Sequence, residues 1–289
     1  MTLRAPHTKR DEPQFYNVKE LDWEADADAA LTHGIDVRTL SADPSSGSKT
    51  SMLRLPPGWQ HSHDASDATV ELFVFEGDVA LNGESVGAGG YLFVPRGSGT
   101  SDLRATTGAQ AVLFFNPDMP IPDGAELNAT RLWQEPWIDI EGIPALHGLM
   151  FKSLRKPDVT DGDLHGGPGG LLRVASLPAG FADADEHVHD CWEELIFIGG
   201  DLLMPPRGRI ARGTYLGNPG GFYHAPMTTQ AGSLMLVQTL APANQIAREY
   251  PNGKEIVDGY RDSESFLAET EQTDWDGLPD FTERIPARA

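Results

Sequence analysis

The sequence predicts an all-β protein that consists of two tandem barrels, and three observations support this prediction. Its apolar runs are short, as in segments 71–75, 194–198 and 234–237, and runs of this length are typical of strands rather than helices. Glycine (31 residues) and proline (22 residues) separate these runs and favour closely spaced turns. A set of landmarks also recurs about 124 residues further along the chain, which indicates a duplicated unit.

Three landmarks appear twice, in the same order, along the chain. The pairs are His61-Ser-His63 with His187-Val-His189, Gly77-Asp78 with Gly200-Asp201, and Pro95-Arg-Gly97 with Pro219-Gly-Gly221. Each His-x-His follows an apolar run that ends in a Pro/Gly turn. Because each half repeats both strands and turns, we expect two barrels of the same fold.

The repeat divides the chain into two barrels with segments around them. The expected parts are an N-terminal extension (residues 1–34), an N-terminal barrel (35–116), a connection (117–147), a C-terminal barrel (148–241) and a C-terminal tail (242–289). At 289 residues, the chain is long enough for two domains that each bury a core of their own.

The composition argues against several classes of protein. A net charge of −21 disfavours nucleic-acid binding, because that affinity comes from Lys and Arg that neutralise phosphates. No run approaches the roughly 18 apolar residues that a membrane span needs, and the charged N-terminus lacks the apolar core of a signal peptide. The single cysteine, Cys191, cannot form an internal disulfide. We therefore expect a cytoplasmic protein that binds neither nucleic acid nor membrane.

Four residues of the second half form a candidate metal site: His187, His189, Glu193 and His224. His187 and His189 share one strand face, because side chains two residues apart on a strand point the same way. Glu193 has the same parity beyond a short connection, and His224 follows a Pro/Gly turn that can bring a neighbouring strand alongside. Three imidazoles and one carboxylate suit one divalent ion of Fe, Mn, Co, Ni or Zn. A six-coordinate ion would keep positions open for substrate or dioxygen.

The first half lacks two of these ligands. Val70 stands where the second half has Glu193, and Thr100 stands where it has His224. We therefore expect the N-terminal barrel to have a degenerate metal site and the C-terminal barrel an intact one.

A second, weaker metal site in the first half would depend on His61 and His63. The connection at residues 64–69 could supply an acidic ligand to it. Glu71 adjoins the vacant ligand position, but a one-residue step turns a side chain to the opposite face of the sheet. Glu71 is therefore the less favoured ligand.

The order of these motifs resembles the pair of motifs of the cupin superfamily. In the second half it reads Gly180, His187-x-His189, Glu193 and Gly200, followed by Gly213, Pro219-x-Gly221 and His224. The two-domain (bicupin) arrangement is similar to bacterial ChrR-like cupins, and the resemblance covers about residues 35–241. It implies two jelly-roll barrels of the double-stranded β-helix type. It also implies one divalent metal ion per chain, with Fe(II) favoured over Mn, Ni, Co or Zn.

The resemblance implies first of all a metal-dependent dioxygenase that cleaves or oxidises a small enolisable carbonyl or phenolic compound. Related cupins with the same ligands act as decarboxylases, isomerases, cyclases or hydrolases, with Mn, Ni or Zn as a non-redox Lewis acid. ChrR-like cupins also suggest a different class, a non-catalytic sensor that binds a metal or ligand. The sequence leaves these three alternatives open, because one fold hosts many functions.

Two further side chains are candidates for contact with a substrate. Tyr223 could donate a hydrogen bond, and Arg173 could pair with a carboxylate or enolate, because guanidinium matches a planar anion. The alternatives to Arg173 are Arg207, Arg209 and Arg212. The partners that we expect are a small organic substrate, dioxygen and a second copy of the chain, because open barrels leave sheet edges that need covering.

Overall fold

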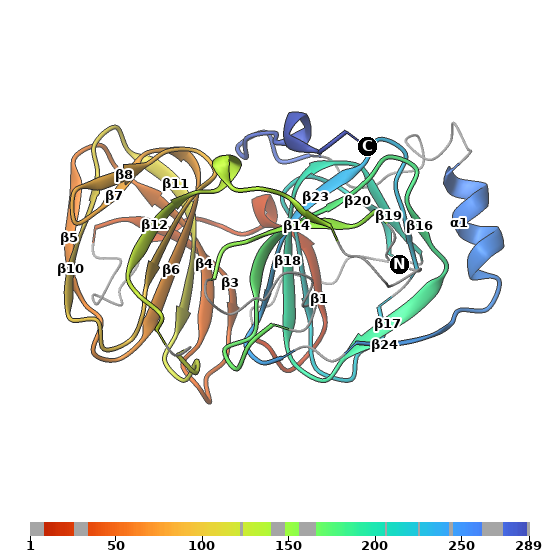
Figure 1. The fold of residues 1–289 in the computed structure, drawn as a ribbon, viewed down its shortest axis with the longest axis horizontal. Helices are drawn as coiled ribbons and strands as arrows, with labels where there is room; N and C mark the ends of the chain where they lie inside the picture. Colours follow the sequence, from red (N-terminus) through yellow and green to blue (C-terminus); the bar gives the residue numbers. More distant parts are fainter. Residues whose placement is uncertain are drawn as a thin grey trace.

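The structure is a computed structural model that describes residues 9–25, 34–121, 124–139, 148–155, 166–205, 207–224, 226–242, 245–261 and 274–287. Most regular structure in these residues is β-strand, arranged as two barrels that lie side by side along the long axis of the molecule (Figure 1). The predicted all-β fold with two tandem barrels is therefore confirmed.

The first barrel combines a large and a small sheet in the described residues. The large sheet has the order β12-β9-β6-β11-β4-β3-β2, from β2 (Glu24–Ala25), β3 (Asp36–Ala42), β4 (Lys49–Leu55), β6 (Thr69–Gly77), β9 (Gly90–Val94), β11 (Ala109–Asn116) and β12 (Asn128–Arg131). The small sheet has the order β5-β10-β7-β8, from β5 (Trp59–Asp64), β7 (Val79–Leu81), β8 (Glu84–Val86) and β10 (Thr100–Ala105).

The second barrel repeats this plan. Its large sheet has the order β1-β21-β18-β23-β15-β14-β13, from β1 (Gln14–Asn17), β13 (Ile138–Asp139), β14 (Met150–Ser153), β15 (Leu172–Leu177), β18 (Glu193–Gly200), β21 (Thr214–Asn218) and β23 (Ser233–Thr239). Opposite it lie the sheet β16-β22-β19-β20 and the pair β17-β24, from β16 (Ala182–Asp183), β17 (Asp185–His189), β19 (Leu202–Met204), β20 (Gly208–Ile210), β22 (Met227–Thr228) and β24 (Gln245–Glu249).

Helical structure is confined to short segments in the described part of the chain. They are the α-helix α1 (Gly253–Arg261) and the 3-10 turns η1 (Val18–Glu20), η2 (Leu132–Gln134) and η5 (Thr282–Arg284). None of these helices is long and apolar enough to cross a membrane.

The segments outside the two predicted barrels also contribute strands to them. β1 comes from the predicted N-terminal extension but pairs with β21 of the second barrel, so a strand that precedes the first barrel in the sequence belongs to the second. The predicted connection supplies β12 to the first barrel and β13 to the second. The predicted tail supplies β24, which covers β17 beside the candidate metal site.

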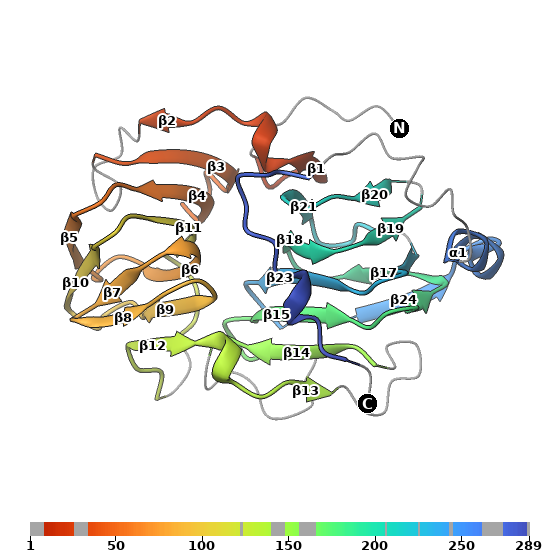
Figure 2. The same ribbon diagram turned by 90° about the horizontal axis from the view of Figure 1, so that it is seen from above.

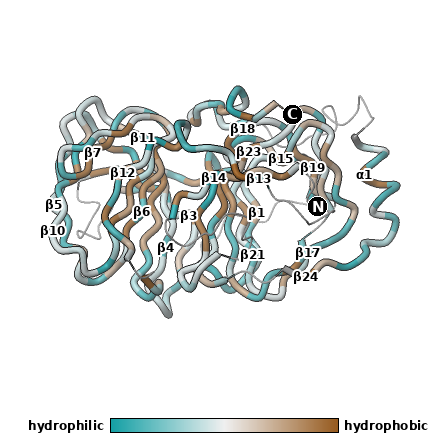
Figure 3. The backbone as a smooth tube through the Cα atoms, in the orientation of Figure 1, coloured by the Kyte–Doolittle hydropathy of each residue, from teal (hydrophilic) through white to brown (hydrophobic). Residues whose placement is uncertain are grey.

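The two large sheets face each other at the centre of the molecule (Figure 2). In β18, Leu195 and Phe197 point into the second barrel, whereas Ile196 and Ile198 belong to the core between the barrels. Because both faces are buried, strands such as β18 carry continuous apolar runs rather than alternating ones. Figure 3 shows these hydrophobic stretches along the strands and hydrophilic stretches at the loops.

The repeated Gly-Asp landmark closes the same turn in each barrel. Gly77 has φ +79°, and a Cβ atom there would lie 1.9 Å from the carbonyl oxygen of Gly108. Asp78, the next residue, accepts hydrogen bonds from the backbone and the side chain of Thr107. Position 77 therefore requires glycine, because a Cβ atom there would collide with the neighbouring backbone. The Asp78 carboxylate connects the two turns through its hydrogen bonds.

The second barrel shows the same arrangement. Gly200 has φ +82°, and a Cβ atom there would lie 2.0 Å from the carbonyl oxygen of Gly232. Asp201 accepts hydrogen bonds from the backbone N–H groups of Gln230 and Ala231, at 2.8 and 2.6 Å. The landmark therefore repeats because its structural role repeats.

Candidate metal centre

Three neighbouring strand segments of the second barrel carry the predicted ligands. His187 and His189 lie on β17, and Glu193 is the first residue of β18. His224 forms an antiparallel bridge with His187, in which each backbone N–H bonds to the other residue's carbonyl at 3.1 and 2.9 Å. This pairing places His224 beside the His-x-His strand, as the sequence predicts.

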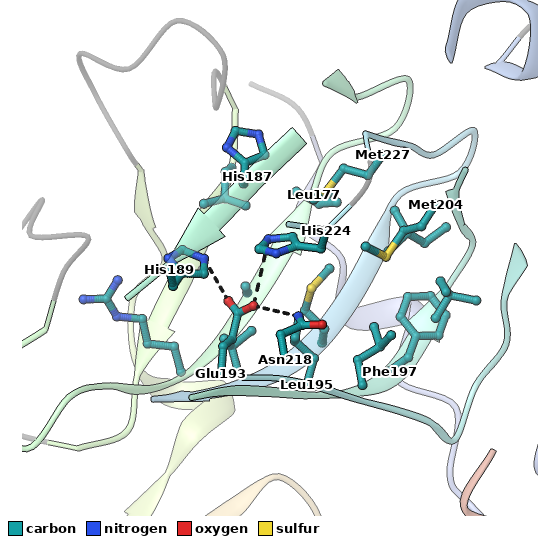
Figure 4. A pocket seen from close by; sticks show the side chains of 18 of the residues that line it. Leu177, His187, His189, Glu193, Leu195, Phe197, Met204, Asn218, His224 and Met227 are labelled. Atoms are coloured by element: carbon teal, nitrogen blue, oxygen red, sulfur yellow. Dashed lines mark hydrogen bonds and ion pairs between the residues drawn. The ribbon is translucent and has the colours of Figure 1, made fainter. Parts of the chain in front are cut away.

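Donor atoms of His189, Glu193 and His224 all lie within 4.8 Å of one another. Figure 4 shows the three side chains pointing toward one another. Nε2 of His189 is 3.3 Å from Oε1 of Glu193, and Nε2 of His224 is 3.9 Å from Oε2 of the same carboxylate. All three side chains are largely buried, with at most 12% of each exposed. The structure therefore brings together three of the four predicted ligands.

His187 lies outside this three-residue group. Its Nε2 is 2.6 Å from Oδ2 of Asp183, and both side chains are buried. The centroid of its ring is 6.2 Å from that of His224, compared with 5.3 Å between His189 and His224. The predicted four-residue ligand set thus differs from the arrangement in the structure, where a carboxylate that the sequence analysis did not single out engages His187.

The charge states of two of the three residues suit a metal ion. Burial lowers the pKa of His224 to about 4, although the nearby Glu193 raises it, so the imidazole is neutral at pH 7. Burial alone raises the pKa of Glu193. The imidazoles of His189 and His224, with the amide of Asn218, outweigh burial and lower this pKa to about 2. A neutral imidazole and an ionised carboxylate are the forms that bind metals.

The spacing of the three donors also fits an ion. A metal about 2.1 Å from each donor separates adjacent donors by about 3 Å. The observed separations of 3.3 and 3.9 Å therefore need only small side-chain rotations to close around an ion. Two imidazoles and one carboxylate are a donor set for Fe(II), Mn(II), Co(II), Ni(II) or Zn(II).

Two further residues hold the Glu193 carboxylate in place. Asn218 donates a hydrogen bond from Nδ2 to Oε2 of Glu193 at 3.2 Å, and Arg207 donates to Oδ1 of Asn218 at 3.0 Å. The Arg207 guanidinium lies 5.6 Å from the ring centroid of Phe15 and 5.3 Å from that of Phe222, and burial lowers its pKa to about 10. The sequence suggested Arg207 only as a substrate contact and gave no signal for Asn218, because the pairing of β18 with β21 is what places Asn218 beside Glu193 and within reach of Arg207.

A mostly apolar cavity of about 160 Å³ adjoins the three residues. Its walls include the side chains of Leu177, Leu195, Phe197, Leu202, Met204, Ile210, Leu216, Met227, Met235 and Val237. Arg173 also lines it, buried and with its guanidinium 4.2 Å from the ring centroid of Phe151. Among the described lining residues, Arg173 carries the one permanent positive charge.

Tyr223, the other predicted substrate contact, takes a different position. Its ring packs against the guanidinium of Arg248 at 3.6 Å, and Arg248 in turn pairs with Glu186 at 2.7 Å. The described cavity lining does not include Tyr223. This arrangement favours a role in packing at the rim.

The surroundings of Cys191 disfavour the thiolate form of its side chain. Burial, followed by the nearby carboxylates of Asp190 and Glu193, raises the pKa of Cys191 to about 12. Its Sγ contacts the carbonyl oxygen of Ala241 at 3.7 Å. The thiol therefore stays protonated at neutral pH.

The first barrel lacks the corresponding donors. Val70 pairs with Val94 across β6 and β9, at the place where the second barrel pairs Glu193 with Asn218. Apolar side chains thus replace both the ligand and its hydrogen-bond donor.

His61 and His63 lie on β5 with ring centroids 6.2 Å apart. In the described residues they do not form part of a group of three metal donors. Burial lowers the pKa of His63, so this imidazole is neutral at pH 7. A second, weaker site there stays a prediction that rests on two imidazoles.

Glu71 points away from the interior of the first barrel, as its parity predicts. Its carboxylate forms a buried ion pair with Arg155 at 2.6 Å and accepts a hydrogen bond from Tyr91 at 2.5 Å. It therefore contributes to the contact between the barrels.

Comparison with known proteins identifies the fold. Residues 11–117 match the ChrR cupin-like domain family, a match that falls on the first barrel, although the motif is more complete in the second. No curated protein sequence matches the chain.

Solved structures align with both barrels. A protein from Nostoc punctiforme described as a candidate dioxygenase has 20% identity and a TM-score of 0.68, over 83% of this chain and 87% of that one. Oxalate decarboxylase from Bacillus subtilis has 14% identity and a TM-score of 0.52, over 88% and 85%. A cupin 2 conserved barrel domain protein from Leptotrichia buccalis has 14% identity and a TM-score of 0.52, over 80% and 96%.

Identities this low show the fold rather than the activity. Together with the ChrR-like match over residues 11–117, they show that the chain has the fold of two tandem cupin barrels and that it resembles ChrR-like cupins.

Proposed function

We propose that the second barrel is the catalytic domain of a metal-dependent oxidoreductase, a dioxygenase that acts on a small enolisable carbonyl or phenolic compound. The observation that carries the proposal is the group of His189, Glu193 and His224 at the wall of an apolar cavity. Two histidines and one carboxylate with open coordination positions are the typical Fe(II) site of non-haem oxygenases. The likeness to a candidate dioxygenase from Nostoc punctiforme is consistent with this choice.

His189, Glu193 and His224 would hold the ion. Fe(II) there would supply redox chemistry with dioxygen and would act as a Lewis acid on a substrate oxygen. Asn218 and Arg207 would keep the Glu193 carboxylate oriented through their hydrogen bonds. The protein's own contribution is therefore a set of oriented donors at the edge of a mostly apolar cavity.

The cavity supports a small substrate with an apolar body. A volume of about 160 Å³ corresponds to a ligand the size of a substituted aromatic ring or a short dicarbonyl compound. The lining is largely aliphatic and aromatic, which suits such a compound.

Arg173 would bind the ionised end of the substrate. It pairs with Val237 on β23, and Val237 pairs with Leu195, two residues after Glu193 on β18. Neighbouring strands are about 4.8 Å apart, so the two inter-strand spacings place Arg173 roughly 10 Å from the Glu193 strand. A short anionic substrate could span this distance from the guanidinium to the metal donors.

The test begins with anaerobic purification and elemental analysis, followed by oxygen-uptake assays with β-dicarbonyl, hydroxyaryl-ketone and catechol compounds. We expect iron and oxygen consumption in the wild type and neither in a His189→Ala variant. We expect Arg173→Met to raise KM more than it lowers kcat, because it removes a binding contact. Iron without turnover on any compound would instead support the non-catalytic sensor.

A decarboxylase is the second candidate, because the bacterial oxalate decarboxylase shares the two-barrel fold. Such an enzyme would release carbon dioxide without net consumption of oxygen, and it would retain Mn rather than Fe. Measurement of both gases in the same assay separates the two reactions.

A further inference from the structure

We propose that Asp183 holds His187 outside the metal coordination sphere, so that the centre is a triad of His189, Glu193 and His224. This inference rests on the proposed metal binding and goes beyond it by fixing the number of protein ligands. The Nε2 atom of His187 lies 2.6 Å from Oδ2 of Asp183, and 2% and 3% of the two residues are exposed. A buried hydrogen bond of this length to a carboxylate is among the stronger kinds in proteins.

The backbone fixes Asp183. This residue lies on β16, opposite Met227 of β22. Its second carboxylate oxygen, Oδ1, accepts a hydrogen bond from the backbone N–H of Asp185 at 3.1 Å. Both oxygens are thus engaged, one by the main chain and one by His187. The acceptor for His187 is therefore built into the fold.

The backbone also sets the direction of the His187 ring. His187 and His224 exchange two backbone hydrogen bonds, so their side chains leave from neighbouring points on the same face. The His189 and His224 rings turn toward Glu193, whereas the His187 ring lies farther from this carboxylate (Figure 4). The donor atoms that lie within 4.8 Å of one another come from the other three residues.

A different role for Asp183 would be to orient His187 as a fourth ligand. Carboxylates often accept the second ring N–H of a metal-bound histidine, and their removal typically weakens metal binding about 10-fold to 100-fold. In that arrangement the other ring nitrogen of His187 would join the donor group. The structure shows a donor group of three residues without His187, which favours the holding role.

A three-residue centre has a consequence for ligand binding. A six-coordinate ion with three protein donors keeps three positions for other ligands, compared with two for a four-residue site. A bidentate substrate and one further small ligand could then bind together. His187 lines the cavity, so it is placed to contact that substrate rather than the ion.

The experiment counts imidazole ligands in the full-length protein loaded with Co(II) or Fe(II), by X-ray absorption spectroscopy, and measures metal Kd by chelator competition. We expect two imidazoles in the wild type. We expect His187→Ala to keep the metal Kd within about 3-fold, and His224→Ala to weaken it more than about 100-fold. Asp183→Ala should release His187, so the imidazole count should rise to three and the metal should bind as tightly or more tightly.

Two further variants test whether an effect comes from misfolding rather than from the loss of the Asp183 carboxylate. Asp183→Asn keeps the shape of the side chain and the acceptor for the Asp185 N–H while it removes the charge, and it should not weaken metal binding. Asp185→Asn removes a neighbouring carboxylate and should leave both readouts unchanged. Circular dichroism checks that each variant is folded.

Three imidazoles in the wild type, or metal binding weakened about 10-fold or more in both Asp183 variants, would overturn the inference. Absence of metal from the loaded wild type would overturn it together with the proposed function. Two imidazoles without oxygen consumption would contradict the dioxygenase and leave the triad standing, because the ligand count requires no turnover.

Discussion

Glu71 and Glu194 are buried at equivalent places in the two barrels, and each accepts a hydrogen bond from a tyrosine of the adjacent strand, Tyr91 and Tyr215 respectively. Each carboxylate also forms an ion pair with an arginine. Gln238 contacts both clusters, since it donates to Glu194 at 2.6 Å and accepts from the arginine that pairs with Glu71 at 3.3 Å. A continuous polar network therefore crosses the otherwise apolar contact between the barrels.

In each ion pair the arginine comes from a segment that contacts the opposite barrel. Arg155 lies between β14 and β15 of the second barrel and pairs with Glu71 of the first. Arg10 bonds through its backbone N–H to the carbonyl of Ala42 on β3 of the first barrel and pairs with Glu194 of the second at 3.3 Å. Each buried carboxylate thus depends on a segment next to the other barrel. The network fixes how the two barrels sit against each other.

We expect Arg155→Met to destabilise the protein by about 3–5 kcal/mol, because it leaves the Glu71 charge buried without its partner. Urea unfolding followed by fluorescence measures the change. The double variant Glu71→Gln with Arg155→Met should recover part of the loss, because both charges are then absent. A loss below about 1 kcal/mol for the single variant would contradict this account.

We expect Gly77→Ala to cost more than about 3 kcal/mol, because the new Cβ would lie 1.9 Å from a backbone oxygen that has little freedom to move. The matched control is Gly58→Ala, where φ is +77° but no atom lies within 4 Å of the new Cβ. This control should cost about 1–2 kcal/mol, from backbone strain alone. Thermal unfolding of both variants checks the difference, and equal losses would show that the close approach is unimportant.

Asp78 should stabilise the fold in a pH-dependent way. Hydrogen bonds from Thr107 hold the pKa of Asp78 below its usual value, despite some burial. A carboxyl whose pKa is lower in the folded state stabilises at neutral pH and loses this contribution as pH falls through the folded pKa. Asp78→Ala should therefore cost about 1 kcal/mol at pH 7 and less near pH 3. A difference in Tm that stays constant between these pH values would count against the hydrogen-bonded carboxylate.

Metal content should respond to the second barrel and not to the first. We expect His224→Ala to lose most of the bound metal, since it removes one of three donors, and His61→Ala to retain it. Elemental analysis of both proteins after identical loading gives the answer. Equal losses from the two variants would contradict the assignment of the site to the second barrel.

We also expect a homodimer. β24 is bonded to β17 along one side, and Ile246 on this strand is 60% exposed, so the strand offers an edge to a second copy. Light scattering should give twice the chain mass of 31.3 kDa. A mass of one chain at micromolar concentration would exclude the dimer.

The sequence alone was sufficient to predict the fold class, the duplication and three residues that lie together. Short apolar runs and repeated glycines carry strand length and turn position, both of which are local properties. Period two on a strand is local as well, and it explains why His189 and Glu193 face one cavity while Glu71 faces the other way. The replacement of the candidate ligand by Val70 in the first barrel is also a local property, so it could be predicted from the sequence.

Only the tertiary structure decided which partners these side chains meet. The pairing of His187 with Asp183, the contact of Asn218 with Glu193 and the exchange of β1 into the second barrel depend on which strands become neighbours and in what register. Register is a property of the whole sheet, set by packing between segments far apart in the chain. The candidate metal donors could therefore be identified from local sequence, whereas which of them lie together and which residues support them depends on long-range contacts.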